Sequence, residues 1–157
     1  MKTRNKLEEE VMEFIKNNNT AVIATVWNNE PYASTIHYES DEDMNIYFLS
    51  HRNTSKYLNI SSYQRGALVI GTGPKHISIQ ARGTVDIVVG ELRDQVVEQF
   101  KMLKRVSFIE NAPTENMEIF EGKDPVVFKF EPIEMTFMNL DNSDYPESLG
   151  KDYHKIL

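Results

Sequence analysis

The residues best suited to chemistry lie in a short polar segment that links an apolar strand pattern to an apolar helix pattern. Residues 46–62 read IYFLSHRNTSKYLNISS, and the polar centre holds the hydroxyls of Ser50, Thr54 and Ser55 and the ammonium group of Lys56. The first turn of a helix presents backbone N–H groups that lack internal partners, at the positive end of the helix dipole. Such a turn binds anions readily, so the segment predicts a phosphate-binding site.

The same segment also has a purely structural interpretation. Serine, threonine and asparagine before an apolar run are ordinary helix caps, and a lysine in a first turn is commonly solvated. Arg52 and Lys56 are the cations that an anionic ligand would need in this segment. The segment alone leaves both interpretations open.

Composition limits the possible partners. The chain has 157 residues, which is sufficient for one domain with a substantial core. Acidic residues number 24 and basic residues 17, which gives a formal net charge of −7, and the sequence has no basic run. A surface of this sign repels nucleic acid and anionic membranes, so we expect neither as a partner.

The sequence contains no cysteine, which excludes disulfides, thiolate metal sites and cysteine nucleophiles and fits a reducing compartment. The charged start MKTRNKLEEE lacks the apolar centre of a signal peptide, and no apolar run approaches the ~20 residues of a membrane span. We therefore expect a cytoplasmic protein.

The elements that must position the polar segment follow from hydrophobic periodicity. Amphipathic helices are expected over 5–17 and 92–105, and a further helix from 54 to near 64. Strands are expected over 20–27, 32–39, 46–49, 67–71, 77–89 and 126–140. Strand 20–27 is apolar in both phases, which predicts burial on both sides. Gly83 in the long strand indicates a bend or a bulge, and Pro132 indicates an edge position or a bulge.

Strands in mostly consecutive order with short turns predict a small antiparallel β-barrel in an α+β domain. We expect residues 1–140 to form this domain and residues 141–157 to be either an ordered arm or a loose tail of it. Residues 107–122 have no clear pattern, although Pro113 and Thr114 are compatible with the start of a short helix through Phe120.

The order of elements and the residues on them resemble the pyridoxamine 5′-phosphate oxidase-like flavin-binding split barrels, in particular the small general stress proteins of bacteria. The resemblance spans residues 5–138 and is carried by TAVIATV, EPYASTIHY, MNIYFLS, NTSKYLNI, ALVIG, SIQARGTVDIV and VVFKFEPIEM. It implies a six-stranded antiparallel split β-barrel with flanking helices. It also implies a homodimer with flavin mononucleotide (FMN) in a cleft at the interface.

The resemblance assigns cofactor-binding roles to particular residues. It implies that the FMN phosphate is held by residues at the end of the third strand and the start of the following helix, namely Leu49, Ser50, Ser55 and Lys56. The isoalloxazine ring would lie along the second strand, at Ser34, Thr35, Ile36 and His37. Ser78 or Gln80 of the long strand would reach the ring or the ribityl edge.

The chain also departs from the pattern of the vitamin B6 oxidases. These enzymes carry an arginine and a lysine on the second strand, where this chain has Ser34 and Glu39, and an arginine at the position of Ser55. Their C-terminal flavin-contacting tryptophan is also missing, because Trp27 is the only tryptophan. We therefore do not expect true pyridoxamine 5′-phosphate oxidase activity.

Other candidate groups give weaker signals. The four histidines are too dispersed for a metal motif, so no metal site is predicted. His37 is the histidine expected to face the ring, where an imidazole donates a hydrogen bond, moves a proton or simply packs. Some split barrels bind heme, for which a histidine is the natural axial ligand. The acidic run over 39–43 is expected to be a solvated turn.

The expected function is that of a homodimeric FMN-dependent oxidoreductase that passes electrons or a hydride between a donor such as reduced nicotinamide and an unknown small molecule. The flavin performs the chemistry, so no catalytic acid or base is assigned. Three alternatives stay open: a deazaflavin in place of FMN, a non-catalytic stress protein that holds flavin or heme, and a barrel with an empty cleft.

Overall fold

The computed structural model describes residues 5–71, 76–102, 125–140 and 153–157. Three helices lie in these residues: α1 (Lys6–Asn17), α2 (Ser55–Ser62) and α3 (Gly90–Met102). The strands are β1 (Thr20–Trp27), β2 (Glu30–Ser40), β3 (Ile46–Ser50), β4 (Arg65–Ile70), β5 (Ile77–Val88), β6 (Val126–Asn139) and β7 (Tyr153–Lys155). Residues 107–122, for which a short helix was considered, lie outside the described part of the chain.

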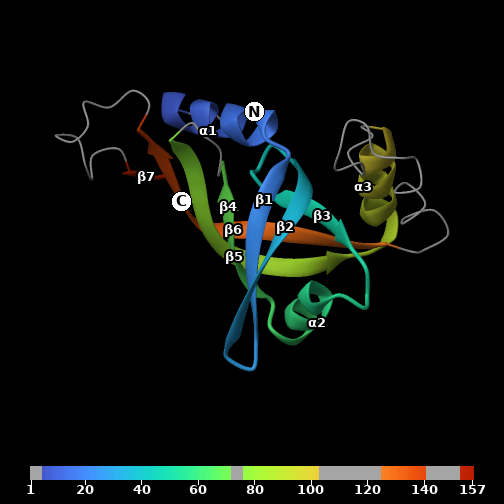
Figure 1. Ribbon diagram of the computed structural model, residues 1–157. Coiled ribbons are helices and arrows are strands. Elements are labelled where there is room, and N and C mark those ends of the chain that lie inside the picture. The colour runs from blue at the N-terminus through green and yellow to red at the C-terminus, as the bar shows by residue number, and fades with distance from the viewer. Residues whose placement is uncertain (1–4, 72–75, 103–124, 141–152) are drawn as a thin grey trace, which may run out of the picture.

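The strands form one antiparallel sheet that closes on itself. Neighbouring strands follow the order β3-β2-β1-β4-β5-β6-β7, and an additional pairing between β3 and β6 completes a six-stranded barrel (Figure 1). β7 lies outside this ring, paired with β6 through Thr136↔Lys155 and Met138↔Tyr153. The predicted α+β fold with a six-stranded antiparallel barrel is confirmed, and the last residues add a seventh strand to its edge.

The barrel interior is a continuous apolar core. Its largest fully buried side chains come from all six barrel strands, α1 and α2, and include Ile15, Ile23, Phe48, Ile79, Phe128 and Phe130. Phe48 stacks on Phe128 across the β3–β6 pairing that closes the barrel, with ring centroids 5.1 Å apart. Burial of this apolar surface is the main force that holds the strands in register.

Helices cover both ends of the barrel and one side of it (Figure 1). At one end, α1 begins with a capping box between Asn5 and Glu8 and buries Val11 and Ile15. At the other end, the Asn59 amide of α2 donates a hydrogen bond of 3.0 Å to Thr25 Oγ1 of β1. α3 packs over the outer face of β3 and β6, where it forms an apolar cluster from Tyr47, Val96, Val97, Phe100 and Val127.

A β-bulge lies in the middle of the β5–β6 pairing. Arg82 pairs with Glu134 and Gly83 pairs with Pro132, which leaves Ile133 of β6 without a partner on β5. A Cβ atom on Gly83 would lie 2.0 Å from the carbonyl oxygen of Glu131, so only glycine permits this approach. The bend or bulge predicted at Gly83 and Pro132 is confirmed.

The outer face of β1 is less buried than the sequence predicts. Ala21, Ile23 and Thr25 point into the barrel and are buried, whereas Val22 and Val26 on the other phase are only half-buried. The prediction that strand 20–27 is buried on both sides is therefore wrong for the single chain. Apolar residues thus occupy an outer face of the barrel, where they are only partly covered. Among the described residues, no helix is long and apolar enough to span a membrane.

Candidate functional site

A chain of side-chain hydrogen bonds fixes the turn from β3 into α2. The Thr54 hydroxyl donates to the carbonyl oxygen of His51 at 2.9 Å and accepts from the Tyr57 N–H at 3.2 Å, so Thr54 is the N-cap of α2. A hydroxyl has one proton, so the contact of 3.0 Å between Ser50 Oγ and Thr54 Oγ1 must have Ser50 as its donor. Ser50 is 6% exposed. Its hydroxyl therefore orients the cap.

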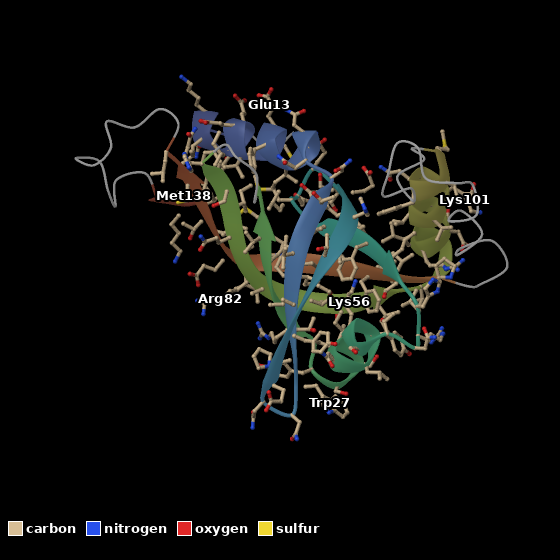
Figure 2. All side chains as sticks on the ribbon, in the orientation of Figure 1. Glu13, Trp27, Lys56, Arg82, Lys101 and Met138 are labelled. Atoms are coloured by element: carbon tan, nitrogen blue, oxygen red, sulfur yellow. The ribbon has the colours of Figure 1, made fainter. Side chains whose placement is uncertain are left out.

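The cap leaves the first two residues of α2 with backbone N–H groups that have no internal partner. These residues are Ser55, which is exposed, and Lys56, which is half-buried. Figure 2 shows Lys56 on the side of α2 that faces the barrel, and its Nζ lies 5.8 Å from the centroid of the Phe48 ring. The helix begins as predicted, with its first cation turned toward the protein.

Lys56 is an electrostatically unusual residue. Within the described residues, its ammonium group has neither a carboxylate partner nor a hydrogen bond. Burial lowers the pKa of Lys56 below its ordinary value of 10.5, because a desolvated ammonium group loses its hydration. Nearby Arg52 donates to the Tyr57 hydroxyl at 3.1 Å and lies over its ring. In this turn Arg52 is therefore bound to Tyr57, whereas Lys56 has no polar partner among the described residues.

The predicted residues of β2 and β3 alternate between the two faces of the barrel wall. Ser34 and Ile36 have the inward phase, and Ile36 belongs to the core at 2% exposed. Thr35 and His37 have the outward phase, where Thr35 is exposed and His37 is half-buried. Leu49 also points outward, but its side chain packs in the cluster beneath α3. The side chains of Ile36 and Leu49 are thus committed to packing.

The two predicted residues of β5 lie on the outer face. Gln80 is exposed and belongs to a paired row that runs Thr35↔Val22↔Val69↔Gln80 across four strands. Three strand spacings of about 4.8 Å place Gln80 roughly 14 Å from Thr35. Ser78, at 8% exposed, lies two residues from Gln80. One chain therefore brings Ser50, Ser55 and Lys56 together but does not join them in one cavity with Ser78 and Gln80.

The acidic turn between β2 and β3 is stabilised by hydrogen bonds to one of its carboxylates. Asp41 accepts hydrogen bonds from the backbone N–H groups of Asp43 and Asn45, from the Asn45 amide and from the Tyr47 hydroxyl. Burial and the Asp41 carboxylate raise the pKa of Tyr47 to about 12. The expectation of a solvated turn is correct for the exposed Glu42 and Asp43 and wrong for Asp41.

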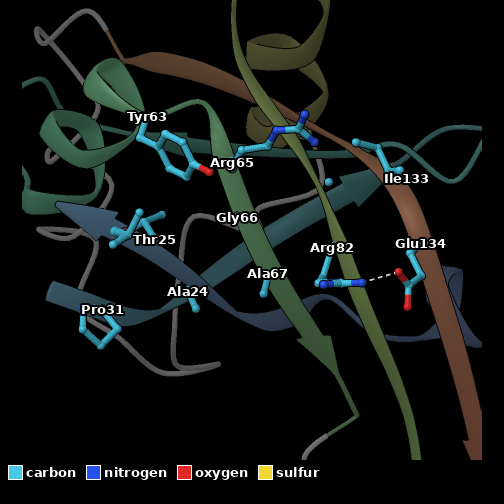
Figure 3. A pocket seen from close by; sticks show the side chains of 12 residues that line it. Ala24, Thr25, Pro31, Tyr63, Arg65, Gly66, Ala67, Arg82, Ile133 and Glu134 are labelled. Carbon is cyan, nitrogen blue, oxygen red and sulfur yellow. Dashed lines mark hydrogen bonds and ion pairs between the residues drawn. The ribbon is translucent and has the colours of Figure 1, made fainter. Parts of the chain in front are cut away.

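Sequence reasoning missed a pocket of about 610 Å³ on the outer face. It lies where β1, β4, β5 and β6 meet the segment after α2, and its polar lining includes Tyr63, Arg65, Arg82 and Glu134 (Figure 3). Neither Ser55 nor Lys56 lines it. The arginines lie far apart in the sequence and have no motif spacing. Their position is set only by the strand register.

The fold and the β3–α2 turn define a class of protein: a closed six-stranded antiparallel barrel in which the N-terminus of a helix at one end could bind an anion. The model of the pyridoxamine 5′-phosphate oxidase family matches residues 7–138. The chain therefore belongs to the pyridoxamine 5′-phosphate oxidase family. A search of curated proteins found no match.

Solved structures show the same fold at low sequence identity. General stress protein 26 from Bacillus anthracis is 20% identical, with a TM-score of 0.63, over 85% of this chain and 94% of that one. A pyridoxamine 5′-phosphate oxidase-related, FMN-binding protein from Nostoc punctiforme is 11% identical, with a TM-score of 0.61, over 98% and 90%. A heme-binding protein from Mycobacterium smegmatis is 12% identical, with a TM-score of 0.68, over 99% and 59%.

Proposed function

We propose that this protein is a homodimeric, cytoplasmic flavoprotein that binds FMN and acts as an oxidoreductase on a small molecule. Family membership and the similarity to an FMN-binding protein from Nostoc punctiforme support the cofactor. The absence of cysteine supports a reducing compartment. The observation that carries the proposal is the desolvated Lys56 at the start of α2.

Lys56 fits a phosphate group for a simple electrostatic reason. A buried cation is costly unless an opposite charge or hydrogen bonds compensate it, and the described residues give Lys56 only the face of the Phe48 ring. A phosphate dianion would supply the missing charge. The hydroxyl of Ser55 and the free N–H groups of the first helical turn would supply the donors that a phosphate accepts.

Six of the predicted residues then have roles that suit their positions. Ser55 and Lys56 would bind the phosphate, and Ser50 would act indirectly by orienting the Thr54 cap. On β2, Thr35 and His37 would offer side chains to the ring, whereas Ile36 would offer only its backbone. Bound FMN supplies hydride and electron transfer, and the protein supplies binding and orientation.

The same arrangement supports the proposed homodimer. Ser78 and Gln80 lie on an apolar outer face that also carries Val22 and Val69, away from the β3–α2 turn. Contact between this face and a second copy would cover the half-buried valines and bring Ser78 or Gln80 of the partner to the cofactor. The proposed activity excludes vitamin B6 oxidation, because Ser34, Glu39 and Ser55 replace its basic residues.

Heme is the second candidate ligand. The similarity to a heme-binding protein from Mycobacterium smegmatis extends over 99% of this chain, and a histidine is the natural axial ligand of heme. A heme site would not require Lys56. A deazaflavin, in contrast, would use the same phosphate contacts as FMN, so replacement of Lys56 would weaken the binding of both flavins.

Replacement of Lys56 tests the cofactor site. We expect Lys56→Ala to weaken FMN binding by about tenfold to a hundredfold in a fluorescence titration, since a hydrogen bond to a charged group contributes roughly 1.5–3 kcal/mol. Lys101→Ala is the matched control, because Lys101 is an exposed lysine on α3 that bonds Glu98. Equal FMN affinity in the two variants would contradict the site. Bound flavin that no nicotinamide donor reduces would favour a non-catalytic flavin carrier.

A further inference from the structure

The pocket of about 610 Å³ is produced by two irregularities of the barrel wall. The pairing of β1 with β4 ends at Ala24↔Ala67, after which β1 continues beside β2 alone and β4 continues beside β5 alone. On the other side, the bulge of β6 moves Ile133 out of the β5–β6 ladder. β-Bulges recur next to binding sites because they redirect side chains. Here the bulge and the divergence of β1 from β4 open the same patch of the wall.

Small residues form a flat floor in this pocket. Ala24, Ala67 and Arg82 are directly paired in register, and Gly66 and Gly83 follow in the same part of β4 and β5. Figure 3 shows the short side chains of Ala24 and Ala67 between Pro31 on one side and the Arg82–Glu134 pair on the other. Strands 4.8 Å apart with methyl side chains give an apolar surface without projections. Such a floor accepts a planar ring.

The rim of the pocket carries a local positive charge in an acidic protein. Arg65 has no ion pair or hydrogen bond from its guanidinium within the described residues, whereas Arg82 is paired with Glu134. Two guanidinium groups and one carboxylate leave a net charge of about +1 at this rim, against −7 for the whole chain. The Arg82–Glu134 pair is solvent-exposed, so an exchange of partners at Arg82 costs little.

We propose that this pocket binds a planar aromatic carboxylate, whose ring lies on the floor of alanines and glycines and whose carboxylate pairs with Arg65 and Arg82. Tyr63 and Ile133 would flank the ring. Guanidinium groups recognise carboxylates through paired N–H donors, which favours an anion over a neutral ring of the same shape. This site is separate from Lys56, and its ligand does not depend on the proposed flavin.

Calorimetric titration of the full chain with 2-naphthoate and with neutral 2-naphthamide tests the proposal. We expect naphthoate to bind at least tenfold more tightly than naphthamide. Arg65→Ala should weaken naphthoate binding at least tenfold, Arg65→Lys should weaken it less, and Lys101→Ala should not change it. Glu134→Gln should strengthen binding about threefold, because it releases Arg82 from its carboxylate.

Any of the following results would overturn the proposal. Equal binding of naphthoate and naphthamide, or equal binding to wild type and to a folded Arg65→Ala variant, would show that the arginine does not select the anion. Failure of naphthoate to bind, combined with a change in sedimentation coefficient on Arg65→Ala, would assign the pocket to contact with a second copy. Unfolding of Arg65→Ala would be seen by circular dichroism, and Glu134→Gln would then decide: unchanged or weaker binding would contradict the proposal.

Discussion

At the scale of single residues, the proposed cofactor site depends on Lys56, whose ammonium group has no counter-charge among the described residues. The folded protein disfavours the charged form of Lys56, since its pKa is lowered by desolvation. Between that lowered pKa and the ordinary value of 10.5, the unfolded chain binds more protons than the folded one, so stability of the ligand-free protein rises with pH across this window. A buried charge that costs stability without a ligand is typical of a binding site.

The lowered pKa of Lys56 predicts that the affinity for FMN depends on pH. FMN affinity should decrease as pH rises through the lowered pKa of Lys56, because neutral lysine no longer attracts the phosphate. The decrease should begin below pH 10.5, the ordinary lysine value. Titrations at a series of pH values up to the ordinary lysine pKa of 10.5 measure it. Lys56→Arg is the control, since a guanidinium stays charged over this range. A wild-type profile that matches the profile of Lys56→Arg would contradict the role of Lys56.

The sequence predicted the types of the site residues better than their orientation. The hydroxyls and the cation of the β3–α2 turn could be identified because a cap must satisfy the N–H groups of the helix. The hydrogen bond that Ser50 donates to Thr54 could not be identified from the sequence, because it depends on the burial of Ser50. Arg65 and Arg82 were missed because only the strand register brings them to one pocket.

At the scale of elements, the lack of a side chain at Gly83 allows the close contact between β5 and β6 at the bulge. We expect Gly83→Ala to destabilise the protein by about 3 kcal/mol or more, because the added Cβ would overlap the carbonyl oxygen of Glu131. Gly90→Ala is a useful comparison, since Gly90 has φ of +69° but no atom within 4 Å of the added Cβ. It should cost only about 1 kcal/mol from backbone strain.

Urea unfolding of both variants measures the difference. A Gly83→Ala protein as stable as Gly90→Ala would show that the β5–β6 contact relaxes without cost and that the bulge does not require glycine. The same pair of variants bears on the pocket, because the bulge lies at its edge. Loss of naphthoate binding in a folded Gly83→Ala protein would indicate that the bulge shapes the pocket.

Most elements were predictable because each carries its own periodicity. The capping box of Asn5 and Glu8 marked the start of α1, and the alternation of β5 placed Ile79 and Ala81 inside the barrel. Ile87 has the same phase as Ile79 and Ala81 but is exposed near the end of the strand. The short β7 could not be predicted, because three residues carry no periodicity and their pairing with β6 is long-range.

At the scale of the whole molecule, the wrong prediction for β1 is informative. Its sequence is apolar in both phases, yet the single chain buries only one of them. A strand with this composition is normally covered on both faces. The difference supports the proposed homodimer, in which a second copy covers Val22 of β1 and Val69 of β4.

A charge placed on this face tests the dimer. We expect wild type to sediment as a dimer and Val69→Glu to sediment as a folded monomer, because each interface would bury two unpaired carboxylates. Gln99→Glu adds the same charge at an exposed position of α3 and should remain dimeric. A dimeric Val69→Glu protein, or a monomeric wild type, would assign the apolar face another role.

The most direct test of the account is an absorbance spectrum of the purified protein, recorded before and after incubation with excess FMN and removal of free ligand by desalting. We predict retained flavin bands near ~450 nm at about one FMN per chain, with loss of these bands in Lys56→Ala. A colourless protein after desalting would contradict the proposed cofactor, and heme bands in the purified protein would assign the site to heme instead.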